Sequence, residues 1–108
     1  MKKVPFVTKA QVEEIAKTYP TPFYIYDEKG IRETARKINQ AFSWNKGYKE
    51  YFAVKATPNP YILKILQEEG CGTDCSSYTE LLMSKVCGFS GRDIMFSSND
   101  TPDQDYRL

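Results

Sequence analysis

The chain has 108 residues, of which 41% are hydrophobic and 14% aromatic, a composition typical of a folded domain and not of a disordered segment. Its 15 basic and 14 acidic residues nearly cancel, so no surplus of positive charge indicates a nucleic-acid partner. Pro5 and Lys9 interrupt the amino-terminal stretch that could pass for a signal peptide, and no apolar run approaches the length of a membrane span. These features predict a cytoplasmic protein without a nucleic-acid or membrane partner.

The three cysteines are Cys71, Cys75 and Cys87, and the chain contains no histidine. An odd number of widely spaced cysteines does not fit a small disulfide-linked secreted protein. Cys71 and Cys75 form a C-x3-C pair, but no second pair follows that could complete a zinc site. We therefore expect no bound metal, and thiols that are free or packed in the core.

The first part of the chain is expected to form a helix, a strand and a second helix. The first helix begins near Thr8 and ends before Pro20, with hydrophobic residues recurring on one face. Residues 22–26 combine aromatic and β-branched side chains, as strands do. Asp27 then caps a helix whose hydrophobic face carries Ile31, Ala35, Ile38 and Phe42. Its polar face is expected to carry only solvated charges: Arg32, Glu33, Arg36 and Lys37.

The next predicted element is a strand over residues 48–55, which follows a turn at residues 45–47. This strand ends on a lysine, and Pro58 prevents it from continuing. Because side chains alternate along a strand, one face carries Tyr51, Ala53 and Lys55, and the other carries Phe52 and Val54.

A helix that starts at the Pro58–Pro60 segment and closes at Gly70 precedes a very short strand at residues 72–75. Ser77 and Glu80 then have the spacing of a capping box, in which the serine and the glutamate each bind a free backbone N–H. The helix that they open is expected to end at Gly88 and to bury Leu81, Leu82 and Val86.

A strand at residues 93–97 and a helix start at residues 101–104 complete the pattern. Strand and helix alternate with a repeat of about 20 residues, which predicts an α/β fold with a parallel sheet built from βαβ units. A (β/α)8 TIM barrel needs roughly 250 residues, so we expect the amino-terminal part of an incomplete barrel. Alone, such a piece is expected to be inactive and to self-associate through its open sheet edge.

The candidate site lies where the predicted strands end. Lys55 closes its strand at the end where barrel enzymes place catalytic groups, and a lysine amine can condense with a carbonyl cofactor. Ala53 is small and leaves room beside the lysine stem for a flat ring. Asp74 reaches the same end from the next strand. The alternatives are an ordinary surface lysine at Lys55 and a structural salt bridge or loop cap at Asp74.

Three further polar residues lie near the same end. The capping-box spacing to Ser77 alone can explain Glu80 as a helix cap, and a cap can also support the site. Ser97 and Asn99 close the last strand, and both residue types are also ordinary turn formers.

Four motifs in this order resemble the fold-type III pyridoxal-phosphate decarboxylases, and among them the diaminopimelate decarboxylases. They are TPFYIYD at residues 21–27, YFAVKA at 51–56, GTDCSSYTEL at 72–81, and the strand at 94–99. The resemblance covers residues 19–101 and implies a barrel of the alanine-racemase-like type. It also implies that residues 1–26 form a helix and a strand that joins a separate β-domain, while residues 27–108 begin the barrel. For the complete protein we expect a homodimer.

The resemblance implies a pyridoxal 5'-phosphate cofactor bonded to Lys55, with Asp74 and Glu80 close to it. The implied reaction is decarboxylation of meso-diaminopimelate to L-lysine and carbon dioxide. Two departures from the pattern, Thr57 and the pair at residues 78–79, leave other readings open. The pair favours ornithine or arginine decarboxylases; carboxynorspermidine decarboxylases, and a non-catalytic barrel that binds the cofactor or regulates a partner, also remain alternatives.

Overall fold

The computed structural model describes residues 3–108; residues 1 and 2, the start of the predicted unit 1–26, lie outside it. Among the described residues no helix has the length and apolar character needed to cross a membrane. The helices are α1 (Lys9–Ala16), α2 (Glu28–Ala41), α3 (Pro60–Glu68) and α4 (Tyr78–Val86). The strands are β1 (Tyr51–Ala53), β2 (Gly72–Cys75) and β3 (Ile94–Phe96), and short 3-10 turns occupy Val54–Ala56, Gly91–Asp93 and Asp103–Arg107.

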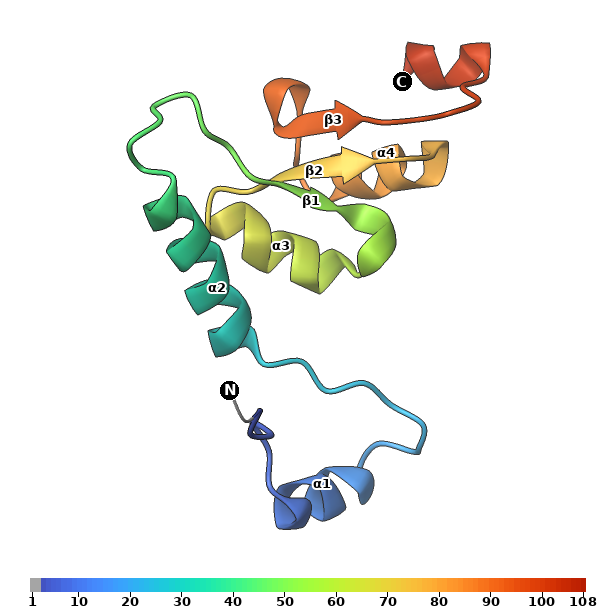
Figure 1. The fold of residues 1–108 in the computed structure, drawn as a ribbon. Coiled ribbons are helices and arrows are strands. Elements are labelled where there is room, and N and C mark those ends of the chain that lie inside the picture. Colours follow the sequence, from blue (N-terminus) through green and yellow to red (C-terminus); the bar gives the residue numbers. More distant parts are fainter. Residues whose placement is uncertain (1–2) are drawn as a thin grey trace.

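The three strands form one parallel sheet in the order β1-β2-β3 (Figure 1). Tyr51 pairs with Gly72 and Ala53 with Asp74, and Asp74 pairs in turn with Met95. Helices α3 and α4 connect successive strands, as parallel pairing requires. The predicted α/β fold built from βα units is therefore confirmed.

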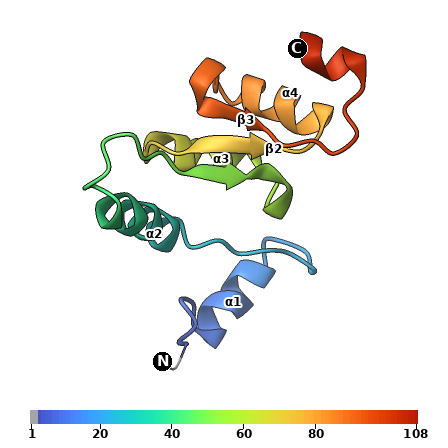
Figure 2. The ribbon, with the colours of Figure 1, turned by 45° about the horizontal axis from the view of Figure 1, so that its top comes forward.

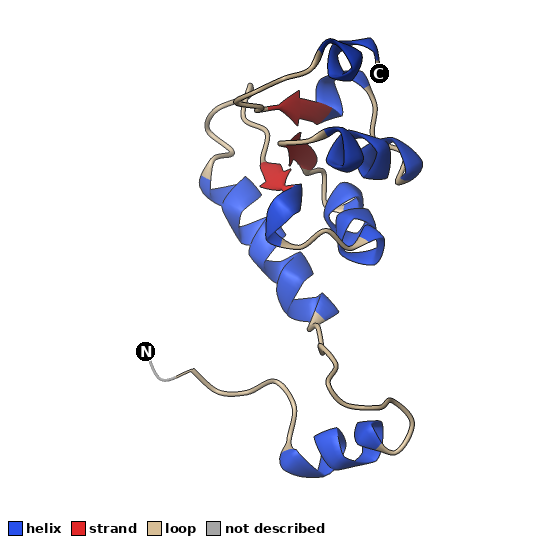
Figure 3. Ribbon diagram, turned by 90° about the vertical axis from the view of Figure 1, so that its right-hand side faces the viewer, coloured by secondary structure: helices blue, strands red, loops and turns tan. Residues whose placement is uncertain are grey.

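Helices α3 and α4 cover one face of the sheet (Figure 2). Phe52 and Val54, which were predicted to share one face of the strand, pack beneath these helices. Val54 is fully buried, and the core has two clusters of buried residues, both of which Phe52 contacts. The opposite face has no helix over it in the part of the chain that the structure describes (Figure 3). Ala53, Asp74 and Met95 lie side by side on this uncovered face, because they are partners in the register of the sheet. The larger cluster contains Val54, Leu63, Cys75, Cys87 and Phe89; the smaller contains Ala35, Ile62, Leu66 and Cys71.

The predicted strand at residues 22–26 is not a strand in this structure. The segment is an unpaired connection in which Phe23 and Ile25 are half-buried, whereas Tyr24 and Tyr26 are exposed. Such an alternation is typical of extended backbone. A strand also needs a hydrogen-bonded neighbour, and no described segment pairs with this one. Its assignment to a separate β-domain stays a prediction.

The predicted strand at residues 48–55 is shorter than expected. Pairing with β2 ends at Ala53, and the chain then turns in a 3-10 helix, Val54–Ala56. The N–H of Thr57 donates to the carbonyl of Val54 at 3.1 Å and closes this turn. Lys55 therefore lies just beyond the strand and not within it. The last predicted helix is likewise a 3-10 helix, Asp103–Arg107, and it begins after Pro102.

Helix α4 buries a different face from the predicted one. Leu81 is half-buried, but Leu82 and Val86 are exposed, and Glu80 and Ser84 are the buried residues of this helix. Glu80, Ser84 and the following Cys87 share one face at helical spacing, and this face lies inward. The prediction failed because it assigned the inward face from hydrophobic residues alone.

Two charges on α2 are paired and not simply solvated. The Arg36 guanidinium donates to both carboxylate oxygens of Glu69 at 2.7 Å, and Arg32 donates to Glu69 at 3.1 Å. These guanidinium groups lower the pKa of Glu69, chiefly through the hydrogen bond from Arg36. Because its pKa is lower in the folded state, Glu69 stabilises the contact between α2 and α3 at neutral pH. That contribution is lost in acid, as the carboxylate takes up a proton.

Gly72 allows the strands to approach closely at the end where they begin. The Tyr51 ring lies across Gly72, and its hydroxyl donates to the carbonyl of Arg92 at 2.7 Å. A Cβ at position 72 would lie 2.6 Å from the carbonyl oxygen of Asp93 and 2.7 Å from the Tyr51 ring. Position 72 therefore has no room for a side chain.

We expect Gly72→Ala to lower the free energy of unfolding by about 1–3 kcal/mol, the usual cost of overpacking. Gly47→Ala is the matched control, because a Cβ there meets only the Asn45 side chain at 3.5 Å. Urea unfolding of both variants measures the difference. Equal stability of the two variants would show that the contact across position 72 is not tight.

Candidate functional site

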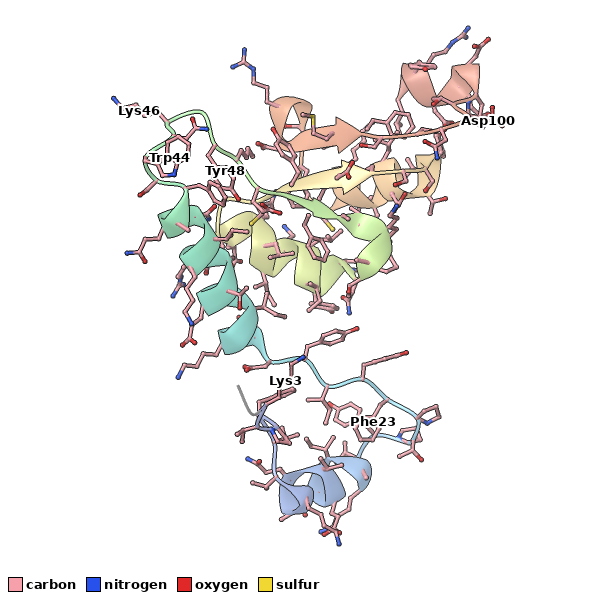
Figure 4. The ribbon with its side chains drawn as sticks, viewed as in Figure 1. Lys3, Phe23, Trp44, Lys46, Tyr48 and Asp100 are labelled. Carbon is pink, nitrogen blue, oxygen red and sulfur yellow. The ribbon has the colours of Figure 1, made fainter. Side chains whose placement is uncertain are left out.

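The candidate site lies at the carboxyl end of the sheet. Figure 4 labels Trp44, Lys46 and Tyr48 near the end where the strands begin, and Asp100 beyond the end where they finish. At this second end the chain leaves β1 into the turn that carries Lys55, and it leaves β3 at Ser97. Parallel strands bring these exits to one edge of the sheet.

Lys55 is exposed, whereas the preceding Val54 is completely buried. The turn thus fixes the backbone through Val54 and leaves the lysine side chain outside the helix-covered core. Among residues 3–108, no carboxylate forms an ion pair with Lys55, and no hydrogen bond involves its amine. No carboxylate of the described chain therefore occupies this amine.

Asp74 and Ala53 are brought together by the register of the sheet. Asp74 is half-buried and lies opposite Ala53 on one side and Met95 on the other. The Ser97 hydroxyl donates to the Asp74 Oδ1 at 2.7 Å. The structure therefore unites Ala53, Asp74 and Ser97 on the uncovered face, with Lys55 two residues beyond Ala53.

Glu80 lies on the buried face of α4 and is only 8% exposed. Its Oε2 accepts hydrogen bonds from the N–H of Ser76 at 2.7 Å and from the Ser77 hydroxyl at 2.9 Å. The Glu80 N–H donates in return to the Ser77 hydroxyl at 3.4 Å. The predicted cap at Ser77 is confirmed, although the glutamate reaches the N–H of Ser76 and not that of Ser77. Glu80 thus holds the loop that follows β2, which begins two residues after Asp74.

One oxygen of this carboxylate has no partner. Glu80 Oε1 is buried and accepts no hydrogen bond from the described residues. Buried polar atoms are nearly always paired in folded proteins. Asn99, the other predicted polar residue, is exposed and makes no side-chain hydrogen bond within residues 3–108.

The three cysteines are free and buried, as predicted. Burial raises the pKa of each thiol above its ordinary value, so the thiols stay protonated and unreactive at neutral pH. Cys75 also lies 3.2 Å from the Ser84 hydroxyl, which accounts for the polar residue on the inward face of α4.

The sequence did not reveal an open groove whose lining begins at Ala56, the residue after Lys55. The groove has a volume of about 780 Å³ and is lined by Tyr24, Tyr26 and residues 56–61. The two tyrosine rings stack with their centroids 6.3 Å apart. The alternation at residues 22–26 was the available signal, because it placed Tyr24 and Tyr26 on one side of the chain.

The residues at this end fit a pyridoxal group in their chemistry. Lys55 supplies an amine without a counter-charge, Ala53 adds little bulk beside it, and Asp74 supplies a carboxylate that Ser97 already holds. No helix of the described part of the chain covers this face of the sheet (Figure 3). A flat ring with an aldehyde and hydrogen-bonding substituents is compatible with this set of side chains.

Comparisons with known proteins identify a pyridoxal-binding family. Residues 28–107 match the family model described as the pyridoxal-binding domain of pyridoxal-dependent decarboxylases. The diaminopimelate decarboxylase of Bacteroides thetaiotaomicron is 38% identical over 92 residues, which are 85% of this chain and 24% of the relative. Protein TabA of Pseudomonas amygdali pv. tabaci is 47% identical over 97 residues, which are 90% of this chain and 23% of that protein.

A solved structure supports the fold as well. The diaminopimelate decarboxylase from m. jannaschii, in co-complex with L-lysine, superimposes with a TM-score of 0.78 at 29% identity. The match covers 87% of this chain and 23% of that structure. The chain therefore spans about a quarter of the length of the relatives it matches, and its βα units correspond to part of their TIM barrel. By its family match, its fold and its relatives, this chain belongs to the pyridoxal-dependent decarboxylases, within their pyridoxal-binding domain.

Proposed function

We propose that the complete protein decarboxylates meso-diaminopimelate to L-lysine and carbon dioxide with pyridoxal 5'-phosphate bonded to Lys55. The observation that carries the proposal is the position of Lys55: exposed and without an ion pair, just beyond the end of β1. Relatives named diaminopimelate decarboxylase, at 32–38% identity over most of the chain, support the choice of substrate.

In this proposal each residue has a separate task. The Lys55 amine would hold the cofactor through its aldehyde group. Ala53 leaves space for the ring, and Asp74 accepts a hydrogen bond that helps to orient the bound group. Glu80 keeps the loop after β2 in place through Ser76 and Ser77. Bound pyridoxal phosphate supplies the electron sink for the electron pair that remains when carbon dioxide departs.

The organisation of the complete protein forms part of the same proposal. Residues 27–108 would begin the barrel, and residues 22–26 would join a separate β-domain. The unpaired backbone of that segment supports this assignment. We also propose a cytoplasmic homodimer.

A panel of amino acids tests the substrate. With pyridoxal phosphate present, we expect kcat/KM for carbon dioxide release from meso-diaminopimelate to exceed that for ornithine, arginine and carboxynorspermidine by about tenfold or more. A preference for ornithine or arginine would favour the alternative that the pair at residues 78–79 suggested. Cofactor bonded to the protein without carbon dioxide release from any compound would favour a non-catalytic barrel. The panel is needed because the name of Protein TabA states no reaction.

A further inference from the structure

Ser97 makes two hydrogen bonds to neighbouring residues of β2. Its backbone N–H donates to the carbonyl of Cys75 at 2.8 Å, which continues the sheet one step beyond β3. Its hydroxyl donates to the Asp74 Oδ1 at 2.7 Å. The first bond fixes the backbone of Ser97, and this fixed backbone aims the hydroxyl at Asp74.

The Asp74 carboxylate lies between two strand ends. On one side it neighbours Ala53, two residues before Lys55, and on the other side it is held by Ser97. No other hydrogen bond to the Asp74 side chain is present among residues 3–108, so its Oδ2 accepts none there. An aspartate whose side chain has no other hydrogen bond within the described residues is not held in one rotamer by hydrogen bonding, and the Ser97 hydroxyl selects one rotamer.

We propose that Ser97 is a positioning residue for the pyridoxal site. Its hydroxyl donates a hydrogen bond to Asp74 Oδ1 and so orients the carboxylate. Oδ2 then remains able to accept a hydrogen bond from a donor near Lys55, at the carboxyl end of the sheet. This inference rests on the proposed function, because it assigns Ser97 a task in cofactor binding. It differs from the turn-forming role of serine, in which the hydroxyl bonds to the local backbone and not to a side chain on a neighbouring strand.

The substitutions test the hydroxyl of Ser97 while its backbone contact stays in place. Ser97→Ala removes the hydroxyl but keeps the N–H that bonds to Cys75, and Ser97→Cys keeps a side chain of similar shape with a much weaker donor. Ser97→Thr keeps a hydroxyl at this position. Ser98→Ala is the matched control, because the neighbouring serine makes no side-chain hydrogen bond within the described residues.

The measurement is the dissociation constant of pyridoxal phosphate for the complete apoprotein, obtained by absorbance titration, together with the thermal unfolding midpoint of each apoprotein. We expect Ser97→Ala and Ser97→Cys to raise the dissociation constant about tenfold, because a hydrogen bond to a charged group is lost. We expect Ser97→Thr and Ser98→Ala to stay within about twofold of the unsubstituted protein. In an Asp74→Ala background, Ser97→Ala should have no further effect, because its target is already gone.

Unchanged binding by Ser97→Ala and Ser97→Cys would overturn the proposal. So would a full tenfold loss that persists in the Asp74→Ala background, or a loss that follows a lowered unfolding midpoint in every variant. Borohydride reduction of the unsubstituted protein with pyridoxal phosphate distinguishes failure of the proposed function from failure of the role of Ser97 alone. If no bond to Lys55 is trapped, the proposed function fails and this inference fails with it; if the bond forms and the Ser97 variants bind normally, only the role of Ser97 is refuted.

Discussion

Replacement of Lys55 by alanine is expected to lower carbon dioxide release by the complete protein about a thousandfold or more. The amine holds the cofactor next to the reacting carbon, and a free amine in solution does not reproduce that effective concentration. Carbon dioxide release under saturating pyridoxal phosphate measures the effect. Because Lys55 is exposed and contacts no carboxylate in the described chain, we expect the folded state to keep its stability.

Lys64→Ala is the control for this experiment. Lys64 is also an exposed lysine, but it lies on α3, which covers the opposite face of the sheet. We expect its kcat to remain within about twofold of the unsubstituted protein, as for other surface substitutions. Comparable losses in both variants, or full activity in Lys55→Ala, would contradict the assignment of Lys55.

The second large effect concerns the core beneath the site. Leu63 is completely buried in the cluster that contains Val54 and Cys75, so it supports the turn that carries Lys55 from below. We expect Leu63→Ala to lower the free energy of unfolding by about 2–5 kcal/mol, through lost hydrophobic transfer and the cavity left behind. Urea unfolding followed by circular dichroism measures the loss.

Leu82→Ala is a control with the same chemical change. Leu82 is 38% exposed on α4, so its truncation removes fewer contacts and leaves no closed cavity. We expect a loss of about 1 kcal/mol or less, in line with other partly exposed positions. A larger loss at Leu82 than at Leu63 would mean that α4 buries the leucine face predicted from the sequence.

Local patterns in the sequence were sufficient to predict most of the fold. Alternation along residues 51–55 predicted that Phe52 and Val54 would pack beneath helices, because a strand shows its side chains to two faces by geometry alone. The cap at Ser77 was likewise predicted, since capping depends on residues within one turn. Asp27 lies at the predicted N-cap position of α2, but its side chain accepts no capping hydrogen bond. These features require no knowledge of distant residues.

Features that depend on distant partners could not be predicted in the same way. Residues 22–26 have a strand pattern, but a strand forms only when another strand pairs with it, and the local pattern does not identify that partner. The inward face of α4 was mispredicted because a polar residue, Ser84, lies on it. Its hydroxyl pairs with the Cys75 thiol, which is nine residues away in the sequence. Arg36 and Glu69 come together only when α2 packs on α3.

The same contrast between local patterns and distant contacts applies to the candidate site. The strand pattern broken by Pro58 predicted Lys55 as the last residue of a strand, whereas the structure places it in the 3-10 turn just beyond β1. The neighbourhood of Ala53 and Asp74 followed from parallel strands. The hydrogen bond from Ser97 to Asp74 did not follow, because it depends on the register between two strands and on one rotamer.

Borohydride reduction of the complete protein with pyridoxal phosphate, followed by peptide mapping, tests the placement of the cofactor most directly. Reduction makes the bond between a lysine and the cofactor permanent, so the labelled peptide identifies the residue. We predict a single label on Lys55. A label on a different lysine, such as Lys49 or Lys64, or no label at all, would contradict the account.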